Sequence, residues 1–172
     1  MKDKALTVEE AAGPATGQAD VLVIGLGNPI LGDDGVGWRV AQEVDARTGR
    51  ADRVEVDCVS VGGLSLMERM LGYSRVILVD SIQTGISPEG AVCALSLEDL
   101  RNPGLGHSAS AHDASLITAL QTAKAMGAAV PLRVDIVAIE ARSCHEFSEE
   151  LSPRIAAAVP LAARTVLDLL GT

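Results

Sequence analysis

Hydrophobic residues along the chain fall into short runs that alternate with longer stretches of helical period. The short runs predict buried strands over Val21–Ile24, Arg53–Cys58, Arg75–Val79, Gly90–Leu95 and Leu132–Ile139. In the longer stretches apolar residues recur three or four positions apart, which predicts helices over Gly35–Thr48, Leu64–Leu71, His112–Met126 and Pro153–Leu170. Strands that alternate with helices predict an α/β fold, here a three-layer α/β/α sandwich around a mostly parallel, five-stranded sheet.

The predicted strand at Gly90–Leu95 interrupts this alternation. The connection that leads to it from Asp80 is too short for a helical crossover, so we expect this strand to run antiparallel. The remaining elements fill residues 20–172 without a repeat or an internal linker, which predicts a single domain. Residues 1–19 carry no strand or helix pattern and predict a flexible N-terminal leader.

Composition and charge limit the classes of partner. Of the 172 residues 48% are hydrophobic but only 2% aromatic, so the core is expected to be aliphatic. A formal net charge of -9 argues against a nucleic-acid partner, because neutralising phosphates needs clustered Lys and Arg. The three cysteines, Cys58, Cys93 and Cys144, are far apart and odd in number, which favours reduced thiols and a cytoplasmic protein. We expect neither a secretory signal nor a membrane insertion, because no uninterrupted apolar segment has the required length.

The segment VLVIGLGNPILGDDGVG, from Val21 to Gly37, combines a strand, a glycine-rich turn and two aspartates. A dinucleotide-binding loop would need a glycine at Ile30, and the aspartates would repel a pyrophosphate. A phosphate loop of the Walker type would need a following Gly-Lys-Ser/Thr, which is absent. The letters GLGNP also begin peptidyl-tRNA hydrolases, but the Thr-Arg-His-Asn segment of those enzymes is missing here. A peptidyl-tRNA hydrolase-like enzyme is therefore the weaker alternative.

Residues of the types that chemistry needs are expected at one edge of the sheet. Asp34 follows the first strand, Cys58 ends the second, Asp80 ends the third, and His112 opens a helix, and sites in such sheets collect at the carboxyl ends of the strands. The acidic residues and the histidine each have a simpler explanation: Asp33 or Asp34 could cap a helix, Asp80 a turn, and His112 could be a polar residue of a helix start.

The loop GLGNPILGDDGVG resembles the N-terminal signature of the hydrogenase maturation proteases. The resemblance continues through RVILVDSI, SAHDASL and IVAIEARSCHEFSEELSPRIAAAV, in the family's order, and covers about Val21 to Leu170. Members of this family are aspartic-type endopeptidases that remove the C-terminal extension from the large subunit of nickel-iron hydrogenases. The resemblance thus implies a hydrolase whose protein partner is a hydrogenase large-subunit precursor.

The resemblance also implies the site. Its metal-binding and catalytic positions fall on Asp34, Asp80 and His112, which would bind nickel carried by the substrate. Three protein ligands, two of them carboxylates, should hold nickel weakly, so we expect little nickel on the free enzyme.

Three alternatives or departures remain open at the sequence level. The chain could be a non-catalytic module of hydrogenase assembly that binds a metal or a partner. Cys144 and His145 with Glu146 suggest a thiol protease, although adjacent residues point in different directions. Finally, many members of the family carry Asp-Gly-Gly-Thr after the second strand, where this chain reads Asp57-Cys58-Val59-Ser60-Val61-Gly62-Gly63. An ungapped match to the family places Cys58, not Asp57, at the family's aspartate, so the hydrogenase subgroup is not fixed.

Overall fold

The computed structural model describes residues 20–49, 53–99, 111–142 and 147–171, with the backbone alone at 111–114. The elements in chain order are β1 (Val21–Leu26), the 3-10 helix η1 (Gly32–Gly35), α1 (Val36–Thr48), β2 (Val54–Val59), α2 (Gly63–Met70), β3 (Arg75–Ile82), β4 (Val92–Ser96), α3 (Ala111–Ala125), β5 (Arg133–Glu140) and α4 (Pro153–Leu170). The predicted leader at 1–19 lies outside the described residues.

The strands form one five-stranded sheet in the order β2-β1-β3-β5-β4. The pairs β1–β2, β1–β3 and β3–β5 are parallel, and β4 pairs antiparallel with β5. The predicted mostly parallel sheet with one antiparallel strand is therefore confirmed. In the sheet, β2 lies on one side of β1 and β3 lies on its other side. The direction in which strands are added therefore reverses between β1 and β3. Crevices that bind ligands lie at such switch points, outside the carboxyl ends of the strands.

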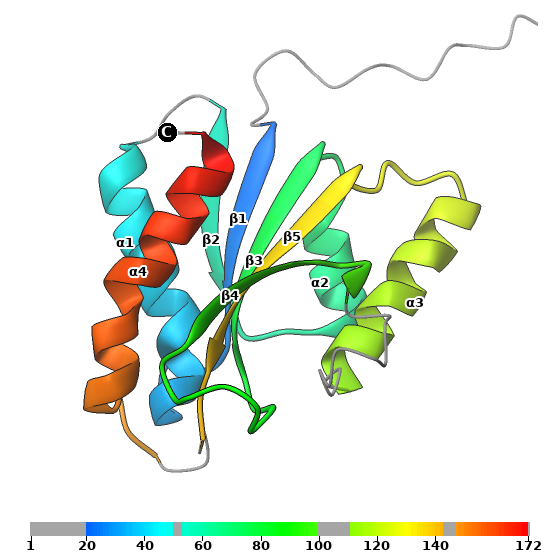
Figure 1. Ribbon diagram of the computed structural model, residues 1–172. Coiled ribbons are helices and arrows are strands. Elements are labelled where there is room, and N and C mark those ends of the chain that lie inside the picture. The colour runs from blue at the N-terminus through cyan, green and yellow to red at the C-terminus, as the bar shows by residue number, and fades with distance from the viewer. Residues whose placement is uncertain (1–19, 50–52, 100–110, 143–146, 172) are drawn as a thin grey trace, which may run out of the picture.

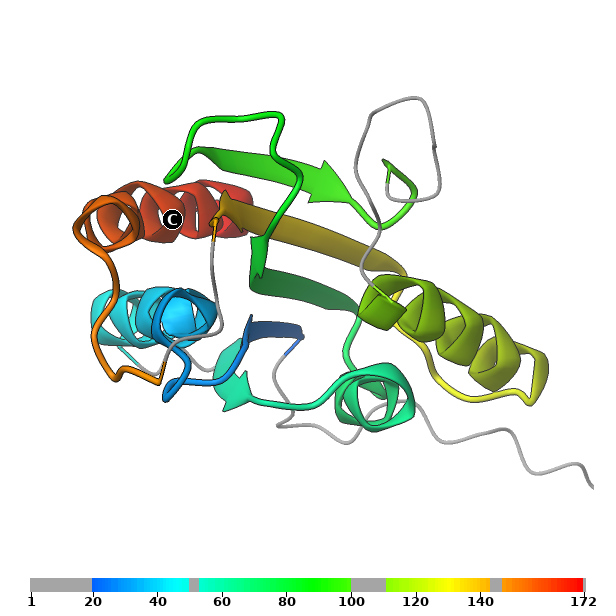
Figure 2. The ribbon, with the colours of Figure 1, turned by 90° about the horizontal axis from the view of Figure 1, so that it is seen from below.

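The helices cover both faces of the sheet (Figure 1). Helices α1 and α4 pack together on one face, and α2 and α3 pack on the other. Alternate residues of each central strand serve the two faces: Val23 belongs to the cluster under α1 and α4, and Leu22 and Ile24 to the cluster under α2 and α3. Strands buried on both sides explain the continuous apolar runs in the sequence. Figure 2 shows the same layers from the edge at which the parallel strands end.

The apolar faces predicted for the helices are buried. The α1 face consists of Val36, Val40, Ala41 and Val44, all with no exposed surface. The α3 face, Leu116, Leu120 and Ala123, is at most 9% exposed. Aliphatic side chains dominate both clusters, as the composition predicts.

The structure moves one predicted boundary that matters for the site. Strand β3 continues to Ile82, because its parallel pairing with β5 extends to the pair formed by Ile82 and Glu140. Asp80 therefore lies within the strand, two residues before its end, instead of ending it as predicted. The predicted loop over Asn102–Ser110 lies in a part of the chain that the structure does not describe. Among the described helices, none is long and apolar enough to cross a membrane.

Two glycines bring α1 directly against the sheet. A Cβ atom on Gly25 would lie 2.3 Å from the carbonyl oxygen of Gly37, and one on Gly37 would lie 2.3 Å from that of Leu26. Neither position has room for a side chain. This close contact places the N-terminus of α1, and the loop that precedes it, at the carboxyl end of β1.

Candidate active site

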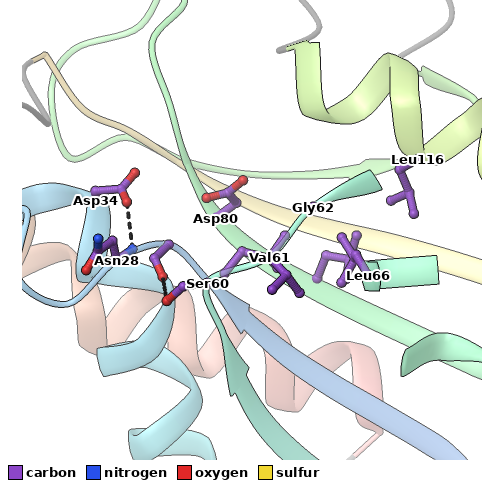
Figure 3. A pocket seen from close by; sticks show the side chains of 11 residues that line it. Asn28, Asp34, Ser60, Val61, Gly62, Leu66, Asp80 and Leu116 are labelled. Carbon is purple, nitrogen blue, oxygen red and sulfur yellow. Dashed lines mark hydrogen bonds between the residues drawn. The ribbon is translucent and has the colours of Figure 1, made fainter. Parts of the chain in front are cut away.

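A small cavity of about 200 Å³ opens at the carboxyl ends of β1 and β3 (Figure 3). Its polar wall comes from the β1–η1 loop, η1 and β3, and its apolar wall from the β2–α2 connection, α2 and α3. The lining residues are Leu26, Gly27, Asn28, Asp34, Ser60, Val61, Gly62, Leu66, Leu78, Asp80 and Leu116. The cavity thus lies at the switch point of the sheet, where the topology predicts a site.

Asp34 is held at the cavity by the turn that precedes it. The backbone N–H of Asn28 donates a 2.6 Å hydrogen bond to Asp34 Oδ2. The N–H of Leu31 closes the turn on the carbonyl of Asn28 at 3.0 Å. Gly27 has a φ of 118° and lies so close to Asp34 that a Cβ atom there would be 1.8 Å from its carbonyl oxygen. The glycines of the loop therefore serve to position a carboxylate and do not surround a phosphate.

Asp80 reaches the same cavity from the adjacent strand. Its Oδ1 accepts a 2.8 Å hydrogen bond from the N–H of Ser81. Figure 3 shows the carboxylates of Asp34 and Asp80 on the polar side of the cavity, opposite Val61 and Leu66. The lining contains no lysine or arginine among the described residues, so the two acids define an anionic site beside an apolar wall.

His112 lies in the first turn of α3, which begins at Ala111. Leu116, one helical turn further along, lines the cavity. The backbone of this helix start is thus adjacent to the site, while the side chain of His112 lies outside what the structure describes. No group of three or more His, Cys, Asp or Glu that could hold a metal occurs among the described side chains. The described part of the site supplies two carboxylates, which suit a divalent cation only if further ligands join them.

Neither aspartate of the loop caps a helix by a side-chain hydrogen bond at η1 or α1, although both lie in the first turn of η1. The residue that precedes α1 is Gly35, and no side chain caps that helix. Asp33 is 7% exposed, and its Oδ1 instead accepts a 2.7 Å hydrogen bond from the N–H of Ser152, the residue that precedes α4. The two neighbours therefore point in different directions: Asp34 lines the cavity, and Asp33 joins the loop to the start of α4.

Cys58, which replaces the aspartate of the family segment, does not line the cavity. Its thiol faces α1, 3.9 Å from the carbonyl oxygen of Trp38. Burial, followed by the charges of Asp57 and Asp45, raises the pKa of the Cys58 thiol. A protonated thiol turned away from the cavity is a poor metal ligand. Cys58 and Cys93 are free thiols, as predicted, and the segment with Cys144 and His145 lies outside the described residues.

Two contributors to the site were missed at the sequence level. Asn28 fixes Asp34 through its backbone, and the Asn28-Pro29 pair is a turn signal that could have indicated this. The hydroxyl of Ser60 donates a 2.8 Å hydrogen bond to the carbonyl of Gly27 and so ties the β2–α2 connection to the loop. No local pattern predicts that contact, because it joins residues 33 positions apart.

Comparison with known proteins identifies the family. The family model described as "HycI: Hydrogenase maturation protease" matches residues 38–169, a region that includes Asp80 and His112 and begins just after Asp34. The Hydrogenase 2 maturation protease of Escherichia coli is 26% identical over 151 residues, 87% of this chain and 90% of that protein. The hydrogenase expression/formation protein HupD of Rhizobium leguminosarum is 23% identical over 150 residues, 87% of this chain and 73% of that protein.

Solved structures agree with this match. The hydrogenase maturating endopeptidase HybD from E. coli superposes with a TM-score of 0.69 and 25% identity, over 87% of this chain and 91% of that one. A hydrogenase 2 maturation peptidase from a Thaumarchaeota archaeon has a TM-score of 0.60 and 31% identity, over 88% and 97% of the two chains. The chain belongs to the hydrogenase maturation protease family, a class of hydrolases.

Proposed function

We propose that this protein is an aspartic-type endopeptidase that removes the C-terminal extension from a nickel-loaded large-subunit precursor of a nickel-iron hydrogenase. The observation that carries the proposal is the meeting of Asp34 and Asp80 at one cavity in a chain of this family. The proposed partner is the precursor itself, and the proposed compartment is the cytoplasm.

Asp34, Asp80 and His112 are the proposed ligands and catalytic residues. Asp34 Oδ2 accepts the N–H of Asn28, which leaves Oδ1 as the oxygen for a ligand. Two carboxylates beside an apolar wall favour a cation, and a histidine at the start of α3 would add a borderline nitrogen donor. The bond is then cut in one of two ways: a carboxylate activates water as a general base, or the metal polarises the scissile carbonyl.

The nickel is proposed to arrive with the substrate. The protein offers two hard oxygens and one imidazole, whereas strongly bound structural metals generally have four ligands and often thiolates. A metal shared between this site and ligands of the precursor would bind the two proteins together better than either alone. Cleavage would then depend on whether the precursor is loaded, which is a check that a maturation step needs.

The test compares cleavage of nickel-loaded and nickel-free precursor by the purified enzyme, with the metal content of each protein measured beforehand. We expect the enzyme to contain little nickel and to shorten only the loaded precursor. Equal cleavage of both forms would remove nickel recognition from the mechanism while leaving the protease assignment in place.

A second arm tests whether the protein is an enzyme at all. Asp34→Asn should lower the rate of shortening of the loaded precursor on the order of 10³-fold. Asp45→Asn, a matched loss of charge at an exposed position of α1, should leave that rate unchanged. Wild-type protein that binds the precursor without ever shortening it would instead identify a non-catalytic assembly module.

A further inference from the structure

Exposed large hydrophobic side chains are concentrated at the edge of the sheet that carries the candidate active site. Eight such side chains occur among the described residues, and five of them lie beyond the carboxyl ends of the parallel strands. Their exposed fractions are 48% for Ile30, 47% for Val61, 62% for Leu64, 62% for Ile86 and 84% for Phe147. Of the other three, Met126 and Leu132 lie on the α3–β5 connection and Leu161 on α4. Single exposed apolar residues are ordinary, but a gathering around one site indicates an interaction surface.

These five side chains, called here the apolar rim, come from four separate connections and, for Leu64, from the first turn of α2. Ile30 follows β1, Val61 and Leu64 follow β2, Ile86 follows β3, and Phe147 follows β5. The β1–η1, β2–α2 and β3–β4 connections lie at different places around the edge at which the parallel strands end (Figure 2). Val61 also lines the cavity itself, so the apolar rim meets the site at this residue (Figure 3).

The connections that carry the apolar rim are fixed by hydrogen bonds. The Glu140 carboxylate, 3% exposed at the end of β5, accepts the N–H groups of Thr84 and Gly85 at 2.8 and 2.7 Å, just before Ile86. The N–H of Ser148, next to Phe147, donates to the carbonyl of Ile30 at 3.1 Å. A surface held in place before binding loses less conformational entropy when a partner covers it.

The size of this surface indicates the kind of partner. The cavity of about 200 Å³ accommodates only a few atoms around the bond that is cut, whereas the apolar rim extends over four connections. Covering it requires a protein surface that is itself apolar and lies beside the scissile segment. A precursor that has not yet closed around its metal exposes apolar surface of this kind, because residues destined for its interior are still open to solvent.

We propose that the apolar rim binds the exposed apolar surface of the unclosed precursor on either side of the segment that enters the cavity. The inference rests on the proposed function and deepens it, because it assigns selection of the precursor to residues that do not touch the metal. Asp34 and Asp80 would then recognise the loaded metal, and the apolar rim would recognise the open state of the protein around it.

The experiment measures the dissociation constant of the nickel-free precursor for the otherwise unaltered enzyme, which is expected not to cut it, so that the complex is not consumed and no proposed metal ligand is changed. Leu64→Ser combined with Phe147→Ser should weaken binding about tenfold or more, since few buried apolar anchors supply most of an interface's energy. Met126→Ser combined with Leu132→Ser is the matched control, because these side chains are 81% and 92% exposed away from the site. The control should bind within about twofold of the parent.

Several outcomes would overturn the inference. If the Leu64/Phe147 double variant binds as tightly as the parent, the apolar rim has no role in recognition. The same conclusion follows if the Met126/Leu132 control weakens binding as much as the Leu64/Phe147 variant does. Equally tight binding of the processed, closed large subunit shows that the open state is not what is recognised. If circular dichroism shows that the first double variant is unfolded, Val61→Thr with Ile86→Thr replaces it. Unaltered enzyme that cuts the loaded precursor but does not bind the nickel-free one refutes the role of the apolar rim alone, whereas enzyme that neither binds nor cuts any precursor refutes the proposed function as well.

Discussion

Gly27 offers the sharpest test of how the loop positions Asp34. Its φ of 118° is one that side-chain-bearing residues rarely adopt, and a Cβ atom there would lie 1.8 Å from the carbonyl oxygen and 2.9 Å from the carbonyl carbon of Asp34. Both are backbone atoms, so no side-chain rotation relieves the contact. Gly27→Ala must therefore move the loop itself.

The size of the expected loss of activity follows from that distance. Raising the separation from 1.8 Å to 3.0 Å requires a displacement of about 1.2 Å, and a misplacement of about 1 Å can lower a catalytic rate on the order of 10²-fold. A hundredfold loss corresponds to about 2.7 kcal/mol of transition-state stabilisation. We expect kcat/KM for the loaded precursor to fall by at least this factor.

Two other glycines separate this effect from a general loss of stability. Gly49 ends α1 with a φ of 57°, and nothing lies within 4 Å of its added Cβ, so Gly49→Ala costs about 1–2 kcal/mol of left-handed strain without moving the site. Gly35→Ala places a Cβ 2.9 Å from Pro29 Cα, a smaller conflict within the same loop. Cleavage activity should therefore be highest for Gly49→Ala, lower for Gly35→Ala and lowest for Gly27→Ala.

The assay combines cleavage kinetics with thermal unfolding and with the amide proton resonance of Asn28, which reports its 2.6 Å bond to Asp34. Gly27→Ala should shift that resonance, even if activity cannot be measured. Gly27→Ala protein that kept the Asn28 resonance and the kcat/KM of Gly49→Ala would refute the argument that this glycine aims the carboxylate.

The remaining predictions address single interactions. Asp34→Asn and Asp80→Asn should each lower cleavage on the order of 10³-fold with little change in thermal unfolding, and wild-type kinetics from either variant would remove that residue from the site. Asp33→Ala should lower the free energy of unfolding by about 1–3 kcal/mol, because it leaves the part-buried N–H of Ser152 without its acceptor, whereas Asp33→Asn should retain most of the stability. The hydrogen bond from Tyr73, ahead of the contribution of a neighbouring arginine, lowers the pKa of Glu55 below its ordinary 4.5. Glu55 thus stabilises the fold above about pH 4.5 and loses this contribution as the pH falls through its lowered pKa. Wild type should therefore be more stable than Tyr73→Phe in urea unfolding near neutral pH, and this difference should disappear in acid. A stability difference that did not change with pH would contradict this.

The sequence by itself determined the fold class, because hydrophobic residues follow a different spacing in strands buried on both faces than in helices buried on one face. Val21–Leu26 became a strand where an apolar run predicted one, and Pro153–Leu170 has the helix bounds that its pattern indicated. The short connection before the fourth strand was sufficient to predict its antiparallel direction. Such features depend on neighbours in the chain, and local patterns record them.

The tertiary structure decided what each of the two aspartates does. Both stand in the same glycine-rich turn, and the sequence offered capping as an explanation for either. Only the packing of α4 against the loop brings Ser152 to Asp33, across 119 residues. Only the passage of β3 beside β1 brings Asp80 to the cavity that Asp34 lines. Contacts between distant segments depend on how the layers pack, and a local pattern of residues does not encode that.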